Sequence, residues 1–172
     1  MARVKTVEPE QAEGVIGAVY GAFQQGSGVI PGPVKLLSAS PGLFEVYTGT
    51  FRYWRNHPHL SSDLMACIRY GVAAQQCFGA CVDFNQAVLT KAGMTRDELA
   101  AMQGDPGTAP LEDRERALLA FVLSAVQDPD AVTDEDVQAL RKLGWTDADV
   151  VDATYHGAIL VTMGTLVKAF KA

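Results

Sequence analysis

The longest amphipathic pattern in the chain runs from Leu60 to Lys91, a segment that contains all three cysteines and no proline. Its apolar residues recur three and four positions apart, which is the spacing of one helix face turned into a core. The pattern predicts one central helix or two helices in series, around which the rest of the chain is organised. These apolar residues are Leu64, Cys67, Ile68, Val72, Ala73, Cys77, Ala80, Cys81, Phe84 and Val88.

Amphipathic and capping signals elsewhere predict further helices, joined by loops rich in glycine and proline. Thr95, Thr133 and Thr146 each stand three residues before an acidic residue, as a helix N-cap does. No segment alternates apolar and polar residues with a period of two, so we expect an all-α fold with roughly seven or eight helices. The predicted helices outside the central segment cover residues 9–25, 33–39, 41–55, 95–102, 111–127, 133–143 and 148–170.

Length and composition fit one domain over residues 1–172 with a sizeable core. The hydrophobic content of 48% is at the high end for a soluble domain, and the predicted closing helix at 148–170 is apolar on most of its circumference. We therefore expect apolar surface to lie between the subunits of a homo-oligomer. The net charge of −6, without a cluster of Lys and Arg, argues against binding to nucleic acid.

The N-terminal sequence and the cysteine count predict a cytoplasmic protein. The first ten residues lack the apolar core of a signal peptide, and no run reaches the roughly 18 uninterrupted apolar residues of a membrane span. Three cysteines are an odd number and a poor match to the disulfide framework of a secreted protein. We expect reduced thiols and no membrane partner.

Four segments of the chain resemble the alkylhydroperoxidase D-like (carboxymuconolactone decarboxylase) family. They are EPEQAEGVIGAVY, VIPGPVKLLSASPGLF, the central cysteine segment and RERALLAFVLSAVQDPDAVTDEDVQALRKLGWTDADVVDA, so the resemblance spans nearly the whole chain. It implies an all-helical fold, a trimer or a hexamer, and, in the redox branch, reduction of hydroperoxides by thiols that a dithiol then restores. Members of the family do different chemistry, so the fold alone does not determine the reaction.

The redox branch uses a glutamate, a cysteine twelve residues later, a second cysteine three further on and a histidine four beyond that. When Cys81 is set on the second cysteine, the resemblance places Ala66 at the glutamate, Phe78 at the first cysteine and Asn85 at the histidine. One thiol stays in register, and Cys77 lies one residue away from its expected partner position. The resemblance therefore implies Cys81, Cys77 and Asn85 as the candidate catalytic residues.

The altered motif predicts weak thiol chemistry. Thiols four apart on a regular helix have Cβ atoms about 6 Å apart, whereas a disulfide needs about 3.8 Å. A bridge between Cys77 and Cys81 therefore requires the helix to unwind around Gly79, the most permissive residue there. Asn85 cannot accept a proton, so we expect Cys81 to have a near-normal pKa. The candidates for a substitute base are Asp63, His57, His59 and His156.

Other interpretations of these residues stay open. The three cysteines could be small buried side chains, the commonest fate of a free cysteine. Cys77 and Cys81 could offer zinc two ligands on one helix face, but Cys67 lies nearly four turns before Cys81. We therefore expect no metal and no cofactor. The two histidines that flank Pro58 are expected to be solvated, and His156 to be satisfied in a core or an interface.

Two hypotheses for the function follow, from different classes. The first is a thiol-dependent hydroperoxide reductase, in which Cys81 is the attacking or resolving thiol and Cys77 is its partner. The second is a protein that keeps the fold without the redox chemistry and serves in ligand binding or assembly. A carboxymuconolactone decarboxylase-like enzyme is a third, although the chain has no paired His and Glu where proton transfer would need them.

Overall fold

The computed structural model describes residues 2–171, and these residues form nine α-helices, three short 3-10 helices and no strand. The prediction of an all-α fold is confirmed. The central cysteine segment forms two of these helices, one of the two arrangements predicted for it. The chain divides into two compact units, one made of the described parts of Met1–His57 and Thr162–Ala172, the other of Pro58–Val161. The prediction of a single domain stays a prediction.

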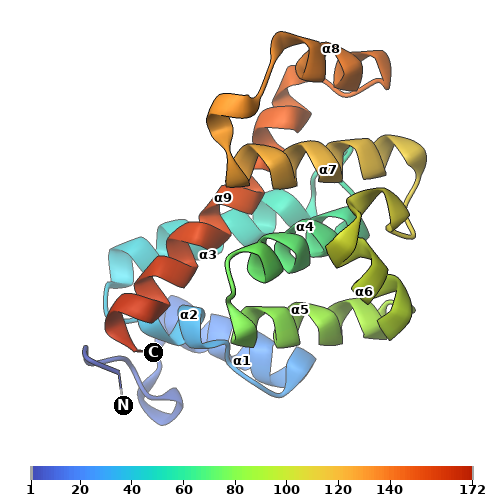
Figure 1. The fold of residues 1–172 in the computed structure, drawn as a ribbon. Coiled ribbons are helices and arrows are strands. Elements are labelled where there is room, and N and C mark those ends of the chain that lie inside the picture. The colour runs from blue at the N-terminus through green and yellow to red at the C-terminus, as the bar shows by residue number, and fades with distance from the viewer. Residues whose placement is uncertain (1, 172) are drawn as a thin grey trace. The chain divides into compact units, whose positions relative to one another are not determined.

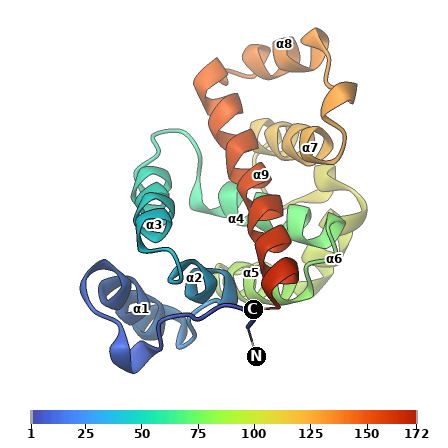
Figure 2. The same ribbon diagram turned by 90° about the vertical axis from the view of Figure 1, so that its left-hand side faces the viewer.

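The first unit is built around the aromatic and aliphatic faces of three helices, of which α3 contacts both α1 and α2 (Figure 2). Its elements are η1 (Pro9–Gln11), α1 (Gly14–Ser27), α2 (Gly32–Leu37), α3 (Pro41–Arg55) and the last turns of α9 (Asp147–Phe170). One predicted helix over residues 9–25 is wrong, because Gly14 has φ 57° and interrupts any right-handed helix before α1. The buried core of this unit consists of Tyr20, Val34, Leu37, Phe44 and Met163.

The second unit is organised around α4, which lies between α5 and α7 (Figure 1) and also contacts α6. Nearly every position of α4 from Leu64 to Ala73 is buried, as expected for a helix covered on several sides. The central place predicted for the cysteine segment is confirmed for its first half. The unit contains α4 (Ser62–Gln75), α5 (Gly79–Lys91), α6 (Arg96–Gly104), η2 (Pro106–Thr108), α7 (Asp113–Gln127), η3 (Pro129–Ala131), α8 (Asp134–Lys142) and α9 as far as Val161.

Two glycines let helices of the second unit approach closely. A Cβ on Gly157 of α9 would lie 2.9 Å from Val122 Cγ1 and 3.4 Å from Ile68 Cγ2. A Cβ on Gly71 of α4 would lie 2.8 Å from Leu123 Cδ2. Contacts under about 3 Å are too short for carbon atoms, so α4, α7 and α9 are packed more tightly here than any larger residue would allow.

The predicted N-caps are confirmed. Thr95 accepts from the backbone of Glu98, and the Glu98 side chain accepts in return from the Thr95 backbone. Thr133 and Asp136 form the same capping box at the start of α8. These bonds satisfy N–H groups that the first turn of a helix leaves without partners.

By length and apolar composition alone, α9 could cross a membrane, but a core helix of a soluble protein passes the same test. Within the second unit α9 buries one stripe of residues, which is the spacing of a helix seated on a core. The stripe contains two polar groups, so its burial depends on their partners. Its members are Asp149, Val150, Ala153, His156 and Gly157.

Candidate functional site

The two candidate thiols lie where α4 ends and α5 begins. Cys77 has φ 54°, the left-handed conformation. The N–H of Phe78 donates to the Ala73 carbonyl at 2.9 Å and that of Cys77 to the Ala74 carbonyl at 3.2 Å. This pair of bonds is a Schellman motif, in which glycine usually takes the place that Cys77 occupies. The regular helix expected through both cysteines is therefore wrong, and the break falls at Cys77, before Gly79 rather than around it.

The three cysteines, all within the described residues, are free thiols in different environments. Cys77 is exposed, Cys81 is half-buried in the first turn of α5, and Cys67 is fully buried in α4. Burial raises the pKa of the Cys81 thiol. Burial, with smaller contributions from nearby carboxylates, raises the pKa of Cys67 to about 12. A near-normal pKa was expected for Cys81, and the structure moves it further from the thiolate that would attack a peroxide.

Asn85, which the resemblance sets at the catalytic histidine, is buried at 2% exposure in α5. Its Oδ1 accepts from Arg69 Nε at 2.9 Å, and its Nδ2 donates to the Cys81 carbonyl at 2.8 Å. Because guanidinium only donates and a carbonyl only accepts, one orientation of the amide satisfies both contacts. Asn85 is therefore a bridge between α4 and the Cys81 turn.

His156 of α9 lies beyond Arg69 in the same cluster. Arg69 Nη1 is 3.1 Å from His156 Nε2, and because a guanidinium only donates, Nε2 must accept. Burial first, and then the Arg69 charge, lower the pKa of His156 to about 3, which a hydrogen bond with the Met65 backbone only partly offsets. The imidazole is neutral at physiological pH, and its burial confirms that His156 lies in a core, as expected.

Comparison with known proteins bears on the fold. No family model matches the sequence, and no curated protein matches it either. A solved structure of an uncharacterized peroxidase-related protein from Ralstonia eutropha JMP134, described as an alkylhydroperoxidase AhpD core, matches with a TM-score of 0.83 and 20% identity. The match covers 99% of this chain and 90% of that one. The chain has the AhpD core fold.

A second solved structure also matches the fold of this chain. It is an uncharacterized peroxidase-related protein from Silicibacter sp. TM1040, with a TM-score of 0.78, 16% identity, and coverage of 99% of this chain and 93% of that one. At such identities the likeness shows the AhpD core fold and leaves the reaction open. The fold that the sequence resemblance implied is confirmed.

Three of the four positions that the resemblance sets on the redox motif, Ala66, Phe78 and Asn85, hold side chains that cannot exchange protons. Ala66 is buried in α4, and Phe78 is the N-cap of α5 with its ring at the edge of the core. Asp63, one turn before Ala66, is exposed at the start of α4. The structure thus brings Cys81 and Asn85 into one cluster with Arg69 and His156, and leaves Cys77 on the surface beside it.

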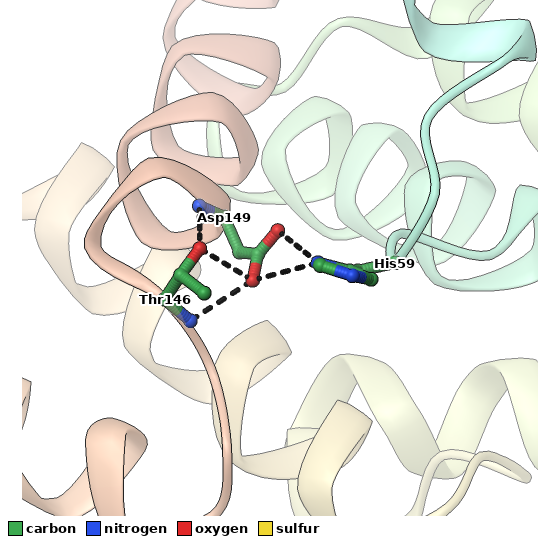
Figure 3. Close-up of polar contacts among 3 residues, drawn as sticks. All are labelled: His59, Thr146 and Asp149. Carbon is green, nitrogen blue, oxygen red and sulfur yellow. Dashed lines mark hydrogen bonds and ion pairs between the residues drawn. The ribbon is translucent and has the colours of Figure 1, made fainter.

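The histidines near Pro58 have different surroundings from those expected. His59 Nδ1 lies 2.9 and 3.2 Å from the two carboxylate oxygens of Asp149 (Figure 3), so it is only half-solvated. The Asp149 carboxylate also accepts from the Thr146 backbone and hydroxyl. Burial opposes its ionisation, but these hydrogen bonds outweigh burial and hold the pKa of Asp149 below its ordinary value. His57 instead packs edge-on against Tyr53, with ring centroids 5.8 Å apart.

Neither of these two histidines is joined by any described contact to the thiols. No group of three or more His, Cys, Asp or Glu side chains within residues 2–171 is arranged to hold a metal ion. The groups gathered at this site are two thiols and a polar network in which the cation Arg69 contacts two neutral side chains, Asn85 and His156. The partners of Arg69 lie 16 and 87 positions away along the chain, so its place in this cluster was not predicted.

Proposed function

We propose that this protein is a slow, thiol-dependent hydroperoxide reductase, in which Cys81 reacts with the peroxide and Cys77 resolves the product. The observation that supports this most strongly is the turn at Cys77. It removes the regular helix that would hold the two thiols apart, and it presents Cys77 to solvent four residues before Cys81. The peroxidase-related descriptions of proteins with this fold agree with the proposal.

The proposed reaction has three steps, and each is balanced in atoms and electrons. The Cys81 thiolate attacks the terminal oxygen of the hydroperoxide, the O–O bond breaks, and the alcohol leaves with a proton while Cys81 becomes a sulfenic acid. The Cys77 thiolate then attacks the Cys81 sulfur, releasing water and forming a disulfide. An external dithiol reduces this disulfide by exchange at the exposed Cys77 sulfur and is itself oxidised.

The rate should be low at neutral pH because no described contact activates the Cys81 thiol. An ordinary thiol is only roughly 3% ionised at pH 7, and burial raises the pKa of Cys81 above the ordinary value. The rate of peroxide reduction should therefore rise about tenfold per pH unit below that pKa, since only the thiolate attacks. This pH dependence distinguishes the site from one with an activated thiol.

The test is turnover of an alkyl hydroperoxide with a dithiol reductant, followed from pH 6 to pH 9. Cys81→Ser should abolish turnover, because serine has no thiolate-like state at these pH values. Cys77→Ser should leave one oxidation per molecule and no turnover. Cys67→Ala, which changes a thiol that is buried and inert, is the matched control and should keep the wild-type rate. An active Cys81→Ser protein would refute the proposal.

A second candidate is a protein that binds a ligand or a partner without redox chemistry. The observation in its favour is that both functional groups of Asn85 are engaged, and that His156 is an acceptor for Arg69 rather than for a thiol proton. Such a protein would show no hydroperoxide turnover at any pH, with all three thiols intact after treatment with a slight excess of peroxide.

We also propose that the protein is a cytoplasmic homo-oligomer, a trimer or a hexamer. Reduced thiols suit that compartment. An apolar groove of about 480 Å³ between α7 and α9 supports self-association, since Val151 and Tyr155 on its wall are more than half exposed. Light scattering at micromolar concentration should give three or six subunits, and a monomer would refute this part of the proposal.

A further inference from the structure

Three hydrogen bonds connect α9 to the turn that holds Cys81. Arg69 donates from Nη1 to His156 Nε2 at 3.1 Å and from Nε to Asn85 Oδ1 at 2.9 Å. Asn85 Nδ2 then donates to the Cys81 carbonyl at 2.8 Å. All four residues belong to the second unit, and Asn85 and His156 are almost fully buried. The path runs through three helices and ends on the backbone of the thiol residue itself.

Each link in this path has a fixed direction. A guanidinium can only donate, so both of its partners must present acceptors. His156 meets this requirement through Nε2, which must therefore be its unprotonated ring nitrogen. Asn85 meets it through Oδ1, and its amide nitrogen is then aimed at the Cys81 carbonyl. A change at His156 should therefore alter how Arg69 donates to Asn85.

The start of α5 has a buried ring, that of Phe78, but no side-chain cap. Its N-cap residue, Phe78, offers no side chain that can accept a hydrogen bond. The N–H groups of Cys81 and Val82 both donate to one carbonyl, that of Phe78, at 2.8 and 2.9 Å. Gly79, the first residue of the helix, has no neighbouring atom within 4 Å of where a Cβ would lie. A helix start of this kind frays readily unless a tertiary contact restrains it.

We propose that Arg69 and His156 are positioning residues for Cys81: acting through Asn85, they hold the first turn of α5 against α4 and keep the thiol half-buried. The inference rests on the proposed function only where it names peroxide as the oxidant. The restraint on the thiol can be measured with any reagent that modifies cysteine.

The experiment uses the three cysteines as reporters in one molecule. The full-length protein is treated with iodoacetamide, and the modification rate of each cysteine is read by mass spectrometry. The exposed Cys77 reports the intrinsic rate, and the buried Cys67 reports any general loosening of the fold. The variants are His156→Leu, which removes the acceptor, and His156→Gln, whose amide can accept from Arg69 and donate to the Met65 backbone.

In His156→Leu the modification rate of Cys81 should rise about fivefold relative to Cys77, the factor that one hydrogen bond of average strength is worth. Its pH profile should shift toward that of an ordinary thiol as the sulfur becomes more exposed. His156→Gln should keep the wild-type rate and profile. In an Asn85→Ala background, where the path is already cut, His156→Leu should have no additional effect on Cys81.

Two outcomes would overturn the inference. One is an unchanged Cys81 rate in His156→Leu. The other is a Cys81 rate in His156→Leu that falls to no more than the rate of the buried Cys67, which would show that Cys81 reacts only through global unfolding and that His156 is a general stabiliser of the fold. If the wild-type protein reduces no hydroperoxide, the proposed function fails, while the alkylation rates still decide the positioning role.

Discussion

Two histidines of the second unit show how the charge of a neighbour determines what an imidazole contributes. His59 is half-exposed and contacts the carboxylate of Asp149, so a proton on its ring would complete an ion pair (Figure 3). His156 is buried and contacts the guanidinium of Arg69, so a proton on its ring would set two cations side by side. One histidine has an anion as its neighbour, and the other serves the fold only while it is neutral.

The largest effect that follows from this difference is a loss of stability in acid. The pKa of His156 is about 3 when folded and ordinarily about 6.5, so the unfolded chain binds the extra proton between these values. The free energy of unfolding should therefore fall by roughly 3 kcal/mol from pH 6.5 to pH 4. Urea unfolding across this range measures the fall in the free energy of unfolding. His156→Gln is the control, because it lacks the part of the pH dependence that His156 causes. Parallel curves for the two proteins would contradict the assignment of a neutral buried His156.

The next effect concerns the neutral acceptor itself. At pH 7, His156→Leu should lower the free energy of unfolding by about 2 kcal/mol, because a buried donor of Arg69 loses its partner. His156→Gln, which can restore both contacts, should cost clearly less. Urea unfolding of the two variants side by side gives the difference. Equal losses would show that ring packing matters more than the hydrogen bond.

A smaller loss of stability is expected for Asp149→Ala, which can be compared with Asp136→Ala at the N-terminus of α8. Asp149→Ala should destabilise by about 1.5 kcal/mol, since it removes both an N-cap partner and the contact of His59. Asp136→Ala breaks the same capping arrangement at an exposed site without a histidine, and should cost less. Thermal unfolding of both variants, alone and with His59→Ala, tests this reasoning. Once His59 is removed, the two aspartate substitutions should destabilise the protein equally. If Asp149→Ala still costs more, the difference comes from the burial of Asp149 and not from His59.

The features that local sequence determines were predictable, and the caps are the clearest case. Thr95 with Glu98 and Thr133 with Asp136 form their capping boxes within four residues of chain, so the bonds do not depend on distant packing. The helix bounds inferred for α3, from Pro41 to Arg55, agree with the structure for the same reason. Proline at the first helical position and a buried aromatic face are both local signals.

The site was harder to predict because its parts depend on tertiary contacts or on an unusual residue. A helix such as α4, which ends at Gln75, is usually followed by Gly or Asn in the left-handed position, and Cys77 gives no such signal. The link of Arg69 to Asn85 and His156 joins three helices, and no periodicity in a single sequence reports it. That Cys81 and Asn85 are neighbours was predictable, because they are four residues apart on one helix.

At Cys77 the residue that would be best for stability differs from the residue that thiol chemistry needs, because the backbone is left-handed. A residue with a Cβ in this conformation costs about 1 kcal/mol that glycine would not, so Cys77→Gly should raise the melting temperature while it removes the exposed sulfur. Selection of random variants for heat resistance alone would therefore favour loss of this thiol. An engineer who wants a more robust protein with intact thiol chemistry should screen for both properties together, or leave this turn unchanged.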